Sequence, residues 1–404
     1  MRENKAMKMN KIQEIFRTFR ENRPNIEMPL AEAQANLGRF NNIVLYGAGS
    51  SGIAVLYFLR RIGIEPRFFL DSDLKKQGNF CEGVEILEPT TARERITGNV
   101  LVLVCINTDG KRYCKSFDEA LRAGGHHAVH QKLADAGYDH VIDYTFFRHC
   151  FELFQNEQYN APSCSDIDLM LAHEAEIEKT YDLLSDPLSK EVFEKILRFR
   201  LLDDTLSVPT MPQDNQYFEP EFYKPRFDAV FIDCGAFDGI SARTFFRVNG
   251  DSFAGYYGLE PDAANFQRLS AYADTLAPNM REKMHIREAA AWKKKSPLKL
   301  YALQGPGSFV ANDIGTDNVQ GVRIDQLGAE NVTFLKMNIE GSEKEALAGA
   351  RAMICRDKPL LAIAGYHRTE DFWEIPLQIH AMREDYALHL RSYMNHISFV
   401  CYAD

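Results

Sequence analysis

Short apolar runs that end at an acidic residue or a glycine recur along the chain. The clearest is residues 230–232, which Asp233 follows and after which a turn contains Gly235 and Gly239. Apolar residues at helical spacing come next, so the pattern predicts a buried strand, a glycine turn and an amphipathic helix. Because glycine has no Cβ and tolerates positive φ, such a turn lets a ligand approach the backbone closely.

A second apolar run, residues 254–259, ends at Glu260, 21 residues beyond Gly239. In a doubly wound α/β sheet, an acid at this position accepts hydrogen bonds from ribose hydroxyls. The acidic turn around Asp233 would repel a phosphate, but it suits a ligand that carries an ammonium and a sulfonium, as S-adenosylmethionine (SAM) does. A strand-to-helix turn with a purely structural role is the alternative interpretation.

Five more strands are predicted downstream, at residues 284–288, 334–340, 360–364, 386–391 and 397–402. The last two pair as an antiparallel hairpin. A sheet of seven strands with this ending is typical of class I methyltransferases.

Polar residues follow the central strand of this set. Strand alternation places Lys336, Asn338 and Glu340 on one face, at the carboxyl edge where open α/β sheets bind ligands. The next helix is predicted to begin with a capping box made by Ser342 and Glu345.

Two further stretches indicate a binding site. Small residues around Ala290 leave room for an adenine ring, although tight packing is an equal alternative. Pro261 occupies the first position of the helix after Glu260, where proline is favoured. Residues 305–321 predict a long irregular loop, which we expect to face the substrate.

A second α/β unit precedes this one. Residues 43–46 predict a strand, a turn with Gly47, Gly49 and Gly52 follows, and the next strand ends at Asp71. The glycines and the acid have the spacing of a dinucleotide-binding fingerprint. We expect a nucleotide or nucleotide sugar to bind here, with a ligand-free structural domain as the alternative.

Composition mainly excludes partners. The chain has 404 residues, a formal charge of -10 and no block of lysine or arginine, so neither nucleic acid nor an anionic membrane is expected. The opening residues lack the apolar core of a signal peptide, and the longest apolar run, residues 100–106, is too short to span a bilayer. We therefore expect a cytoplasmic protein. Eight cysteines without paired spacing predict reduced thiols and no metal site, and the sequence leaves the oligomeric state open.

Several motifs lie in order along the second half of the chain. They are Q-Y-F at 216–218, V-F-I-D-C-G-A-F-D-G at 230–239, G-L-E-P-D at 258–262, K-M-N-I-E-G-S-E at 336–343 and Y-H-R-T-E-D-F-W-E-I-P at 366–376. From about residue 181 to residue 402 the chain thereby resembles FkbM-type SAM-dependent methyltransferases. The resemblance implies a class I fold, SAM as methyl donor, and O-methylation of a hydroxyl on a glycan, sugar nucleotide or natural product. Asn338 stands where the family usually has aspartate, which leaves its catalytic or metal role open.

The first part of the chain resembles the nucleotide-sugar-binding domain of bacterial sugar acyltransferases. The residues that carry this are the G-A-G-S-S-G turn, the F-F-L-D strand end and the G-V-E-I-L-E-P stretch. We expect an α/β protein with a Rossmann-like domain at residues 1–160, a helical connector at 161–225 and a class I methyltransferase domain at 226–404.

Roles follow for the residues at the strand ends. His367 and Glu340 are the candidates for a general base, and Lys336 would orient the acceptor or Glu340, unless the two only form an ion pair. The residues expected to bind SAM are Asp233, Gly235, Phe237, Gly239, Glu260, Pro261 and Ala290. Two other classes stay open: an oxidoreductase that binds a nicotinamide cofactor at the first glycine turn, and a non-catalytic nucleotide-sugar-binding protein.

Overall fold

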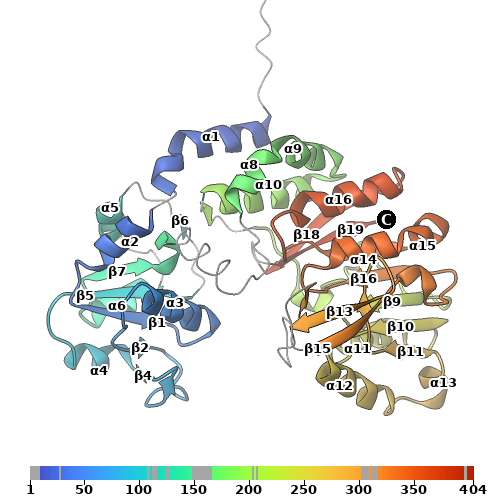
Figure 1. Ribbon diagram of the computed structural model, residues 1–404, viewed down its shortest axis with the longest axis horizontal. Coiled ribbons are helices and arrows are strands. Elements are labelled where there is room, and N and C mark those ends of the chain that lie inside the picture. Colours follow the sequence, from blue (N-terminus) through green and yellow to red (C-terminus); the bar gives the residue numbers. More distant parts are fainter. Residues whose placement is uncertain are drawn as a thin grey trace, which may run out of the picture. The chain divides into compact units, whose positions relative to one another are not determined.

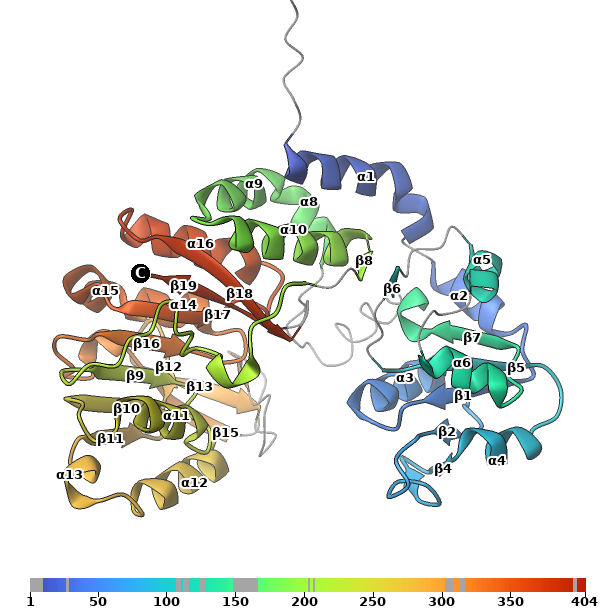
Figure 2. The same ribbon diagram turned by 180° about the vertical axis from the view of Figure 1, so that it is seen from behind.

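The computed structural model describes most of the chain, in two compact units. The described residues are 10–26, 29–106, 110–111, 116–123, 128–147, 166–202, 204–205, 208–301, 309–311, 317–394 and 398–404. One unit comprises Met1–Ala161 and Leu197–Ser207, and the other comprises Pro162–Ile196 and Val208–Asp404. Each unit has its own sheet (Figure 1 and Figure 2).

The first unit is built on a six-stranded sheet. Its order is β3 (Phe80–Cys81), β4 (Val84–Leu87), β2 (Phe69–Leu70), β1 (Asn42–Tyr46), β5 (Val100–Val104) and β7 (His140–Asp143). All neighbours pair in parallel except β3, which is antiparallel to β4. The parallel part has the strand order of doubly wound nucleotide-binding sheets. The central strands β1 and β5 are almost wholly buried, because a parallel sheet is covered on both faces.

Helices and one short strand pair complete the first unit. The helices are α1 (Lys11–Ile26), α2 (Leu30–Leu37), α3 (Ser50–Arg61), α4 (Pro89–Glu94), α5 (Phe117–Ala123) and α6 (Ala128–Asp135). The pair is β6 (Gly110–Lys111) with β8 (Asp204–Thr205). The predicted strand, turn and helix around the first glycine turn are confirmed as β1 and α3.

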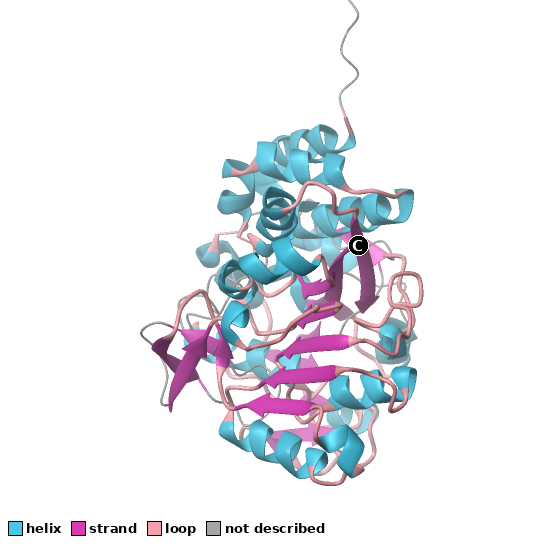
Figure 3. Ribbon diagram, turned by 90° about the vertical axis from the view of Figure 1, so that its right-hand side faces the viewer, coloured by secondary structure: helices cyan, strands magenta, loops and turns pink. Residues whose placement is uncertain are grey.

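The second unit is built on the predicted seven-stranded sheet. Its order is β11 (Met284–Arg287), β10 (Gly255–Leu259), β9 (Val230–Cys234), β16 (Phe334–Met337), β17 (Leu360–Ala364), β19 (Ser398–Ala403) and β18 (Leu388–Met394). Strands β11 to β17 pair in parallel, and β19 is antiparallel to both of its neighbours. In this sheet β19 alone is therefore reversed. Figure 3 shows the strands side by side with helices around them.

Two groups of helices accompany this sheet. Those after the parallel strands are α11 (Ile240–Asn249), α12 (Ala263–Ala273), α13 (Pro278–Arg281), α14 (Glu343–Gly349), α15 (Arg351–Asp357) and α16 (Asp371–Met382). Those that precede it in sequence are α8 (Ile167–Ala172), α9 (Glu174–Leu183) and α10 (Pro187–Leu202), whose residues from Leu197 on belong to the first unit. The start of α10 is fixed to β18, since Asp186 accepts from Ser189 and contacts both His389 and Arg391. None of the described helices has the length and apolar character needed to cross a membrane.

Aromatic side chains fill the core beneath the carboxyl edge. The rings of Phe231 on β9 and Phe334 on β16 stack with their centroids 4.7 Å apart. Phe218 meets both rings edge-on, and Phe245 on α11 packs against Phe231. This packing holds β9 and β16 side by side, so the residues after the two strands lie close together.

The prediction of an irregular loop at residues 305–321 is wrong in part. The unit has a second, four-stranded sheet in the order β12 (Ala290–Ala291), β15 (Asp317–Val322), β13 (Ser296–Tyr301) and β14 (Phe309–Ala311). Residues 305–308 and 312–316 lie outside the described part of the chain. The sequence of β15 is mostly polar, and its pairing with β12 and β13 makes it a strand, with Val319 packed among Leu298 and Leu300.

Candidate active site

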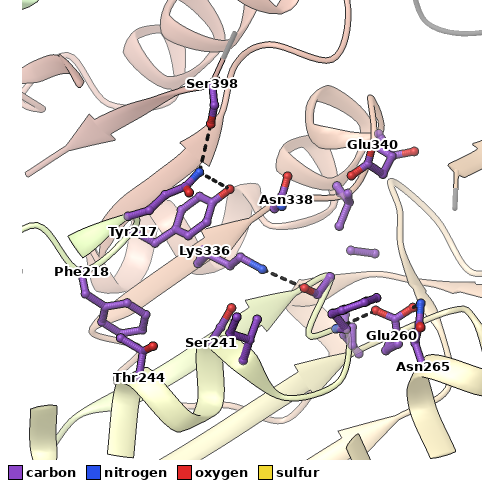
Figure 4. Close-up of a pocket in the computed structure, with 18 of the residues that line it drawn as sticks. Tyr217, Phe218, Ser241, Thr244, Glu260, Asn265, Lys336, Asn338, Glu340 and Ser398 are labelled. Atoms are coloured by element: carbon purple, nitrogen blue, oxygen red, sulfur yellow. Dashed lines mark hydrogen bonds between the residues drawn. The ribbon is translucent and has the colours of Figure 1, made fainter. Parts of the chain in front are cut away.

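A cavity of about 690 Å³ opens at the carboxyl edge of the seven-stranded sheet. Its wall comes from the residues that follow β9, β10 and β16, from β12, and from the segment 213–218. Figure 4 shows these side chains converging from separate strands. The site therefore lies where open α/β sheets bind their ligands.

The glycine turn after β9 forms one side of the cavity. Gly235 has φ +78°, and a Cβ on this residue would lie 2.0 Å from the carbonyl oxygen of Asn338. Phe237 has φ 52° and also lines the cavity. Gly239 is different, because its Cβ would meet the ring of Tyr272 at 2.9 Å. The lack of a side chain at Gly239 thus lets the turn pack against α12. At Gly235 it lets the turn approach the residues that follow β16.

Asp233 and Lys336 form a buried ion pair beneath this turn. Lys336 Nζ lies 2.9 Å from Asp233 Oδ1, and the two side chains are 2% and 0% exposed. Lys336 Nζ also donates to the carbonyl oxygens of Gly235 (2.8 Å) and Cys234 (3.3 Å), and the Tyr256 hydroxyl donates to Asp233 Oδ2 (2.8 Å). Lys336 reaches the cavity wall, but its ammonium holds the turn (Figure 4).

The expected roles of these two residues need correction. Lys336 has three acceptors for its three ammonium hydrogens, so it does not fit the role of orienting the acceptor. It also contacts Asp233 rather than Glu340, because β16 ends at Met337 and strand alternation does not continue to residue 340. Asp233 supports the turn from below instead of facing the cavity.

Glu260 follows β10 and lines the cavity beside Pro261 and Ala290. Its carboxylate accepts from the backbone N–H groups of Phe237 (2.8 Å) and Asp262 (3.0 Å). The residue is 5% exposed. Burial raises the pKa of Glu260 above its usual value, against the opposing hydrogen bonds from Asp262 and Phe237. A carboxylate is thereby fixed at the cavity wall, next to the small side chain of Ala290.

Hydrogen-bonded polar side chains line the opposite wall, and no role was predicted from the sequence for Gln216 or Tyr217. Gln216 Nε2 donates to Ser398 Oγ (3.1 Å) and to the Tyr217 hydroxyl (3.4 Å). The Tyr366 hydroxyl donates to Asn338 Oδ1 (3.2 Å). Tyr217 has φ 71°, a conformation that costs a non-glycine residue energy and that clusters at functional sites. The Q-Y-F motif was the available signal, but only the fold shows that it faces the cavity.

The turn after β16 carries Glu340 into the cavity wall. Glu340 and Gly341 have positive φ values of 54° and 88°. Glu343 accepts from the N–H groups of Ile339 (2.8 Å) and Gly341 (2.9 Å), and Arg368 Nε donates to the Gly341 carbonyl oxygen (2.6 Å). The turn is therefore fixed by a buried carboxylate that the sequence analysis missed.

The predicted capping box is wrong for the same reason. The Ser342 side chain makes no capping hydrogen bond to α14. Glu345 pairs instead with Lys293 at 2.9 Å. Since Glu343 already binds the backbone at the start of the helix, Glu345 is left to point outward.

His367 lies behind the wall rather than in it. Its side chain is 8% exposed, with Nδ1 2.9 Å from Glu343 Oε1 and Nε2 3.6 Å from Glu340 Oε1. Burial lowers the pKa of His367, but the carboxylates of Glu343 and Glu340 outweigh it and raise the pKa well above its usual value. The expected role of general base does not fit this placement, because His367 is not among the described residues that line the cavity and both of its ring nitrogens face carboxylates.

The geometry agrees with a comparison against protein families. Residues 233–401 match the methyltransferase FkbM domain. The FkbM resemblance expected from the sequence is confirmed over this stretch, which contains Glu260, Lys336 and Glu340.

One solved structure resembles the whole chain. It is methyltransferase FkbM from Methylobacillus flagellatus KT, with a TM-score of 0.73, 20% sequence identity, and coverage of 98% of this chain and 99% of that chain. At this identity the likeness shows the fold alone, and it confirms the predicted α/β class with a class I methyltransferase sheet.

Two other structures resemble part of the chain. A putative rRNA-methylase from Clostridium thermocellum has a TM-score of 0.34 and 8% identity, and covers 48% of this chain and 97% of that chain. Fibrillarin from Aeropyrum pernix, in complex with natively bound SAM, has a TM-score of 0.28 and 11% identity, and covers 45% and 67%. Scores this low carry no argument. A comparison with curated proteins found no match.

The first glycine turn lies outside the FkbM match. Gly47 has φ +107°, and a Cβ on Gly52 would lie 2.0 Å from the Gly47 carbonyl oxygen. Asp71 accepts from the Ala48 N–H (3.0 Å) and from Lys76 Nζ (2.9 Å). The structure thus brings Gly47, Gly52 and Asp71 together, while Gly49 begins α3 in an extended conformation. The nucleotide ligand expected here stays a prediction.

Proposed function

We propose that the protein is a SAM-dependent O-methyltransferase that acts on a hydroxyl of a small molecule or glycan. The observation that carries the proposal is the Glu260 carboxylate in the cavity wall, at the end of the second parallel strand, where ribose hydroxyls are bound in doubly wound sheets. The FkbM match and the class I fold support the same reaction type.

The residues around Glu260 fit SAM. Gly235 lines the cavity without a side chain, so a ligand can lie against the backbone of the turn. Ala290 and Ala291 line the neighbouring wall, and their small side chains leave room for a flat adenine ring. When bound, SAM supplies an electrophilic methyl group. The Glu260 carboxylate makes this part of the site acidic, which favours a ligand with a net positive charge.

The other half of the cavity is suited to the acceptor. Ile240 and Met394 line it although they are 61% and 49% exposed, and Gln216 and Thr244 provide polar contacts. This mixture fits a hydroxylated molecule with one apolar face, such as a glycan, sugar nucleotide or natural product. Holding donor and acceptor aligned supplies most of the catalysis. Glu340 lines the cavity and is our candidate for accepting the hydroxyl proton.

Calorimetry of SAM binding tests the proposal. Glu260→Ala should raise the dissociation constant roughly 10- to 100-fold, since hydrogen bonds to a charged group contribute about 1.5 to 3 kcal/mol. Glu219→Gln is the matched control, because Glu219 is also buried in this unit but does not line the cavity. Unchanged affinity in a folded Glu260→Ala protein would remove Glu260 from the site, and no SAM binding by the wild type would refute the proposed function.

A separate proposal concerns the first unit, where the Gly47 turn and Asp71 support binding of a nucleotide or nucleotide sugar. Ligand binding to the native state stabilises it by mass action. A sugar nucleotide should therefore raise the melting temperature of the intact protein, and Asp71→Asn should reduce this shift without affecting the shift produced by SAM. A screen in which no nucleotide has an effect at millimolar concentration would assign the first unit a structural role.

A further inference from the structure

Three buried side chains with ligating atoms lie together behind the cavity wall. Glu343 at the start of α14, His367 after β17 and Asp371 at the start of α16 each place one such atom within 4.8 Å of the others. Glu343 and Asp371 are buried, and His367 nearly so. None of the three is among the described residues that line the cavity. Methyl transfer therefore does not explain why they meet.

The Nδ1 atom of His367 lies close to the Glu343 carboxylate but is not well aligned with it for a hydrogen bond. Nδ1 lies 2.9 Å from Glu343 Oε1, yet this buried nitrogen has no aligned hydrogen-bond partner among the described residues. The Glu343 oxygens accept from backbone N–H groups instead. Ligands bound to one metal ion at about 2.1 Å lie roughly 3 to 3.5 Å apart. The Nδ1 and Oε1 atoms have nearly this spacing.

The charges of the cluster require a counter-ion or a proton. The carboxylates of Glu343 and Asp371 are both buried, at 0% and 2% exposure. Arg368 gives Asp371 only its backbone N–H (2.8 Å), while its guanidinium binds the Gly341 carbonyl oxygen. Neither carboxylate is paired with a lysine or arginine side chain in the described part of the chain. Buried carboxylates that lack such a partner bind a cation or hold a proton.

We propose that Glu343, His367 and Asp371 bind one divalent transition-metal ion, such as Zn²⁺ or Mn²⁺. One imidazole nitrogen with two carboxylate oxygens is a donor set that favours these ions over Mg²⁺ or Ca²⁺. The opposite ring nitrogen, Nε2, lies 3.6 Å from Glu340 Oε1. A carboxylate in that place orients a metal-bound histidine. The ion links α14, α16 and the Glu340 turn, so it fixes the cavity wall and does not contact the acceptor.

Cobalt binding to the intact, tag-free protein tests the site. After dialysis against a chelator, Co²⁺ should give visible absorption bands that saturate at about one equivalent and should raise the melting temperature. Asp371→Asn, which keeps the shape of the side chain, and His367→Gln should each weaken binding roughly 100-fold or more. Glu340→Gln removes only the outer carboxylate and should weaken binding about 10-fold.

A control variant addresses a second histidine–carboxylate contact in the same unit. His389 Nδ1 lies 2.6 Å from Asp186 Oδ2, and Asp186→Asn should bind Co²⁺ like the wild type. Folded wild-type protein without saturable bands would overturn the proposal and leave an ion pair that shares a proton. Unchanged binding in both Asp371→Asn and His367→Gln would overturn it too, because the ion would then lie elsewhere. Neither readout needs SAM or an acceptor, so failure here leaves the methyltransferase proposal intact.

Discussion

The two glycine turns of this protein share one construction and differ in charge. In each, the acid at the end of the second parallel strand accepts a backbone N–H of the turn: Asp71 from Ala48 at 3.0 Å, and Glu260 from Phe237 at 2.8 Å. Asp71 also binds Lys76, whereas no lysine or arginine hydrogen-bonds to Glu260 in the described residues. The two turns therefore share a backbone construction and differ in whether a lysine pairs with the acid.

The pKa values of the two acids reflect this difference. Burial raises the pKa of Asp71, but hydrogen bonds from the Asp73 N–H, Lys76 and the Ala48 N–H outweigh it and hold the pKa below its usual range. For Glu260, burial prevails and the pKa is raised. A neutralised acid is compatible with a phosphate-bearing ligand at the first turn. At the second turn, Glu260 has no lysine or arginine partner among the described residues, and its carboxylate suits a ligand with positive charge.

The largest effect should come from replacing a glycine of either turn by alanine, which adds one methyl group. Gly235→Ala combines positive φ with a Cβ 2.0 Å from the Asn338 carbonyl oxygen, and should cost about 3 kcal/mol or more of unfolding free energy and abolish SAM binding. Gly52→Ala meets the Gly47 carbonyl oxygen at 2.0 Å and should destabilise the first unit only. Gly49→Ala, with no atom within 4 Å of the added Cβ, is the control and should change stability by less than about 0.5 kcal/mol.

Urea unfolding and calorimetry on the three variants measure this. If Gly235→Ala bound SAM like the wild type, the close approach of the turn would have no part in ligand binding. If Gly49→Ala were as unstable as Gly52→Ala, the first turn would be sensitive to any substitution and the comparison would fail.

A smaller effect concerns pH. Ribose hydroxyls favour the charged form of Glu260, so SAM affinity should fall as the pH falls through its raised pKa and be constant above it. For the free protein the sign is opposite: the stability contributed by a raised carboxyl pKa is present below the unfolded-state pKa and is lost as the pH rises through the folded-state pKa. Binding measured between pH 4 and pH 8 should lose this dependence in Glu260→Gln and keep it in Asp71→Asn. The same profile in all three proteins would mean that another group titrates.

The smallest effect should come from removing the cation of the first turn. Lys76→Ala makes this turn resemble the second, and the pKa of Asp71 should rise toward its usual value in an NMR titration. The Lys76 side chain is 40% exposed, so the loss of unfolding free energy should stay below about 1 kcal/mol. An unchanged pKa would show that the backbone N–H groups alone set the charge of Asp71, and Lys75→Ala is the neighbouring control.

The sequence predicted the elements that have a strong local pattern. Apolar runs such as the one that ends at Asp233 identified the strands, and their number and final hairpin indicated a class I methyltransferase sheet. The polar strand β15 and the partner of Lys336 were not predictable in this way, because both depend on which segments the fold brings together. The expectation of no metal site rested on cysteine and histidine spacing, which does not test for ligands from separate elements such as those of the proposed site.

Glu343 is a second example of a residue whose role could not be predicted from the local sequence. Its neighbour Glu345 has the better local signal, since it completes a capping box with Ser342. In the fold, Glu343 binds two backbone N–H groups and approaches His367, which lies 24 residues further along the chain. Local pattern favoured the wrong glutamate because the deciding contact is not local.

The buried pair of Asp233 and Lys336 has a consequence for how the sheet assembles. The two residues stand directly opposite each other in the pairing of β9 with β16, 103 residues apart in sequence. Neither charge can leave water cheaply until the other is in place, because one unpaired buried charge costs several kcal/mol. A slip of one residue would turn every side chain of β16 to the other face and separate the charges. The ion pair therefore rejects misaligned strands during folding, at the centre of a sheet whose apolar runs alone would tolerate more than one register.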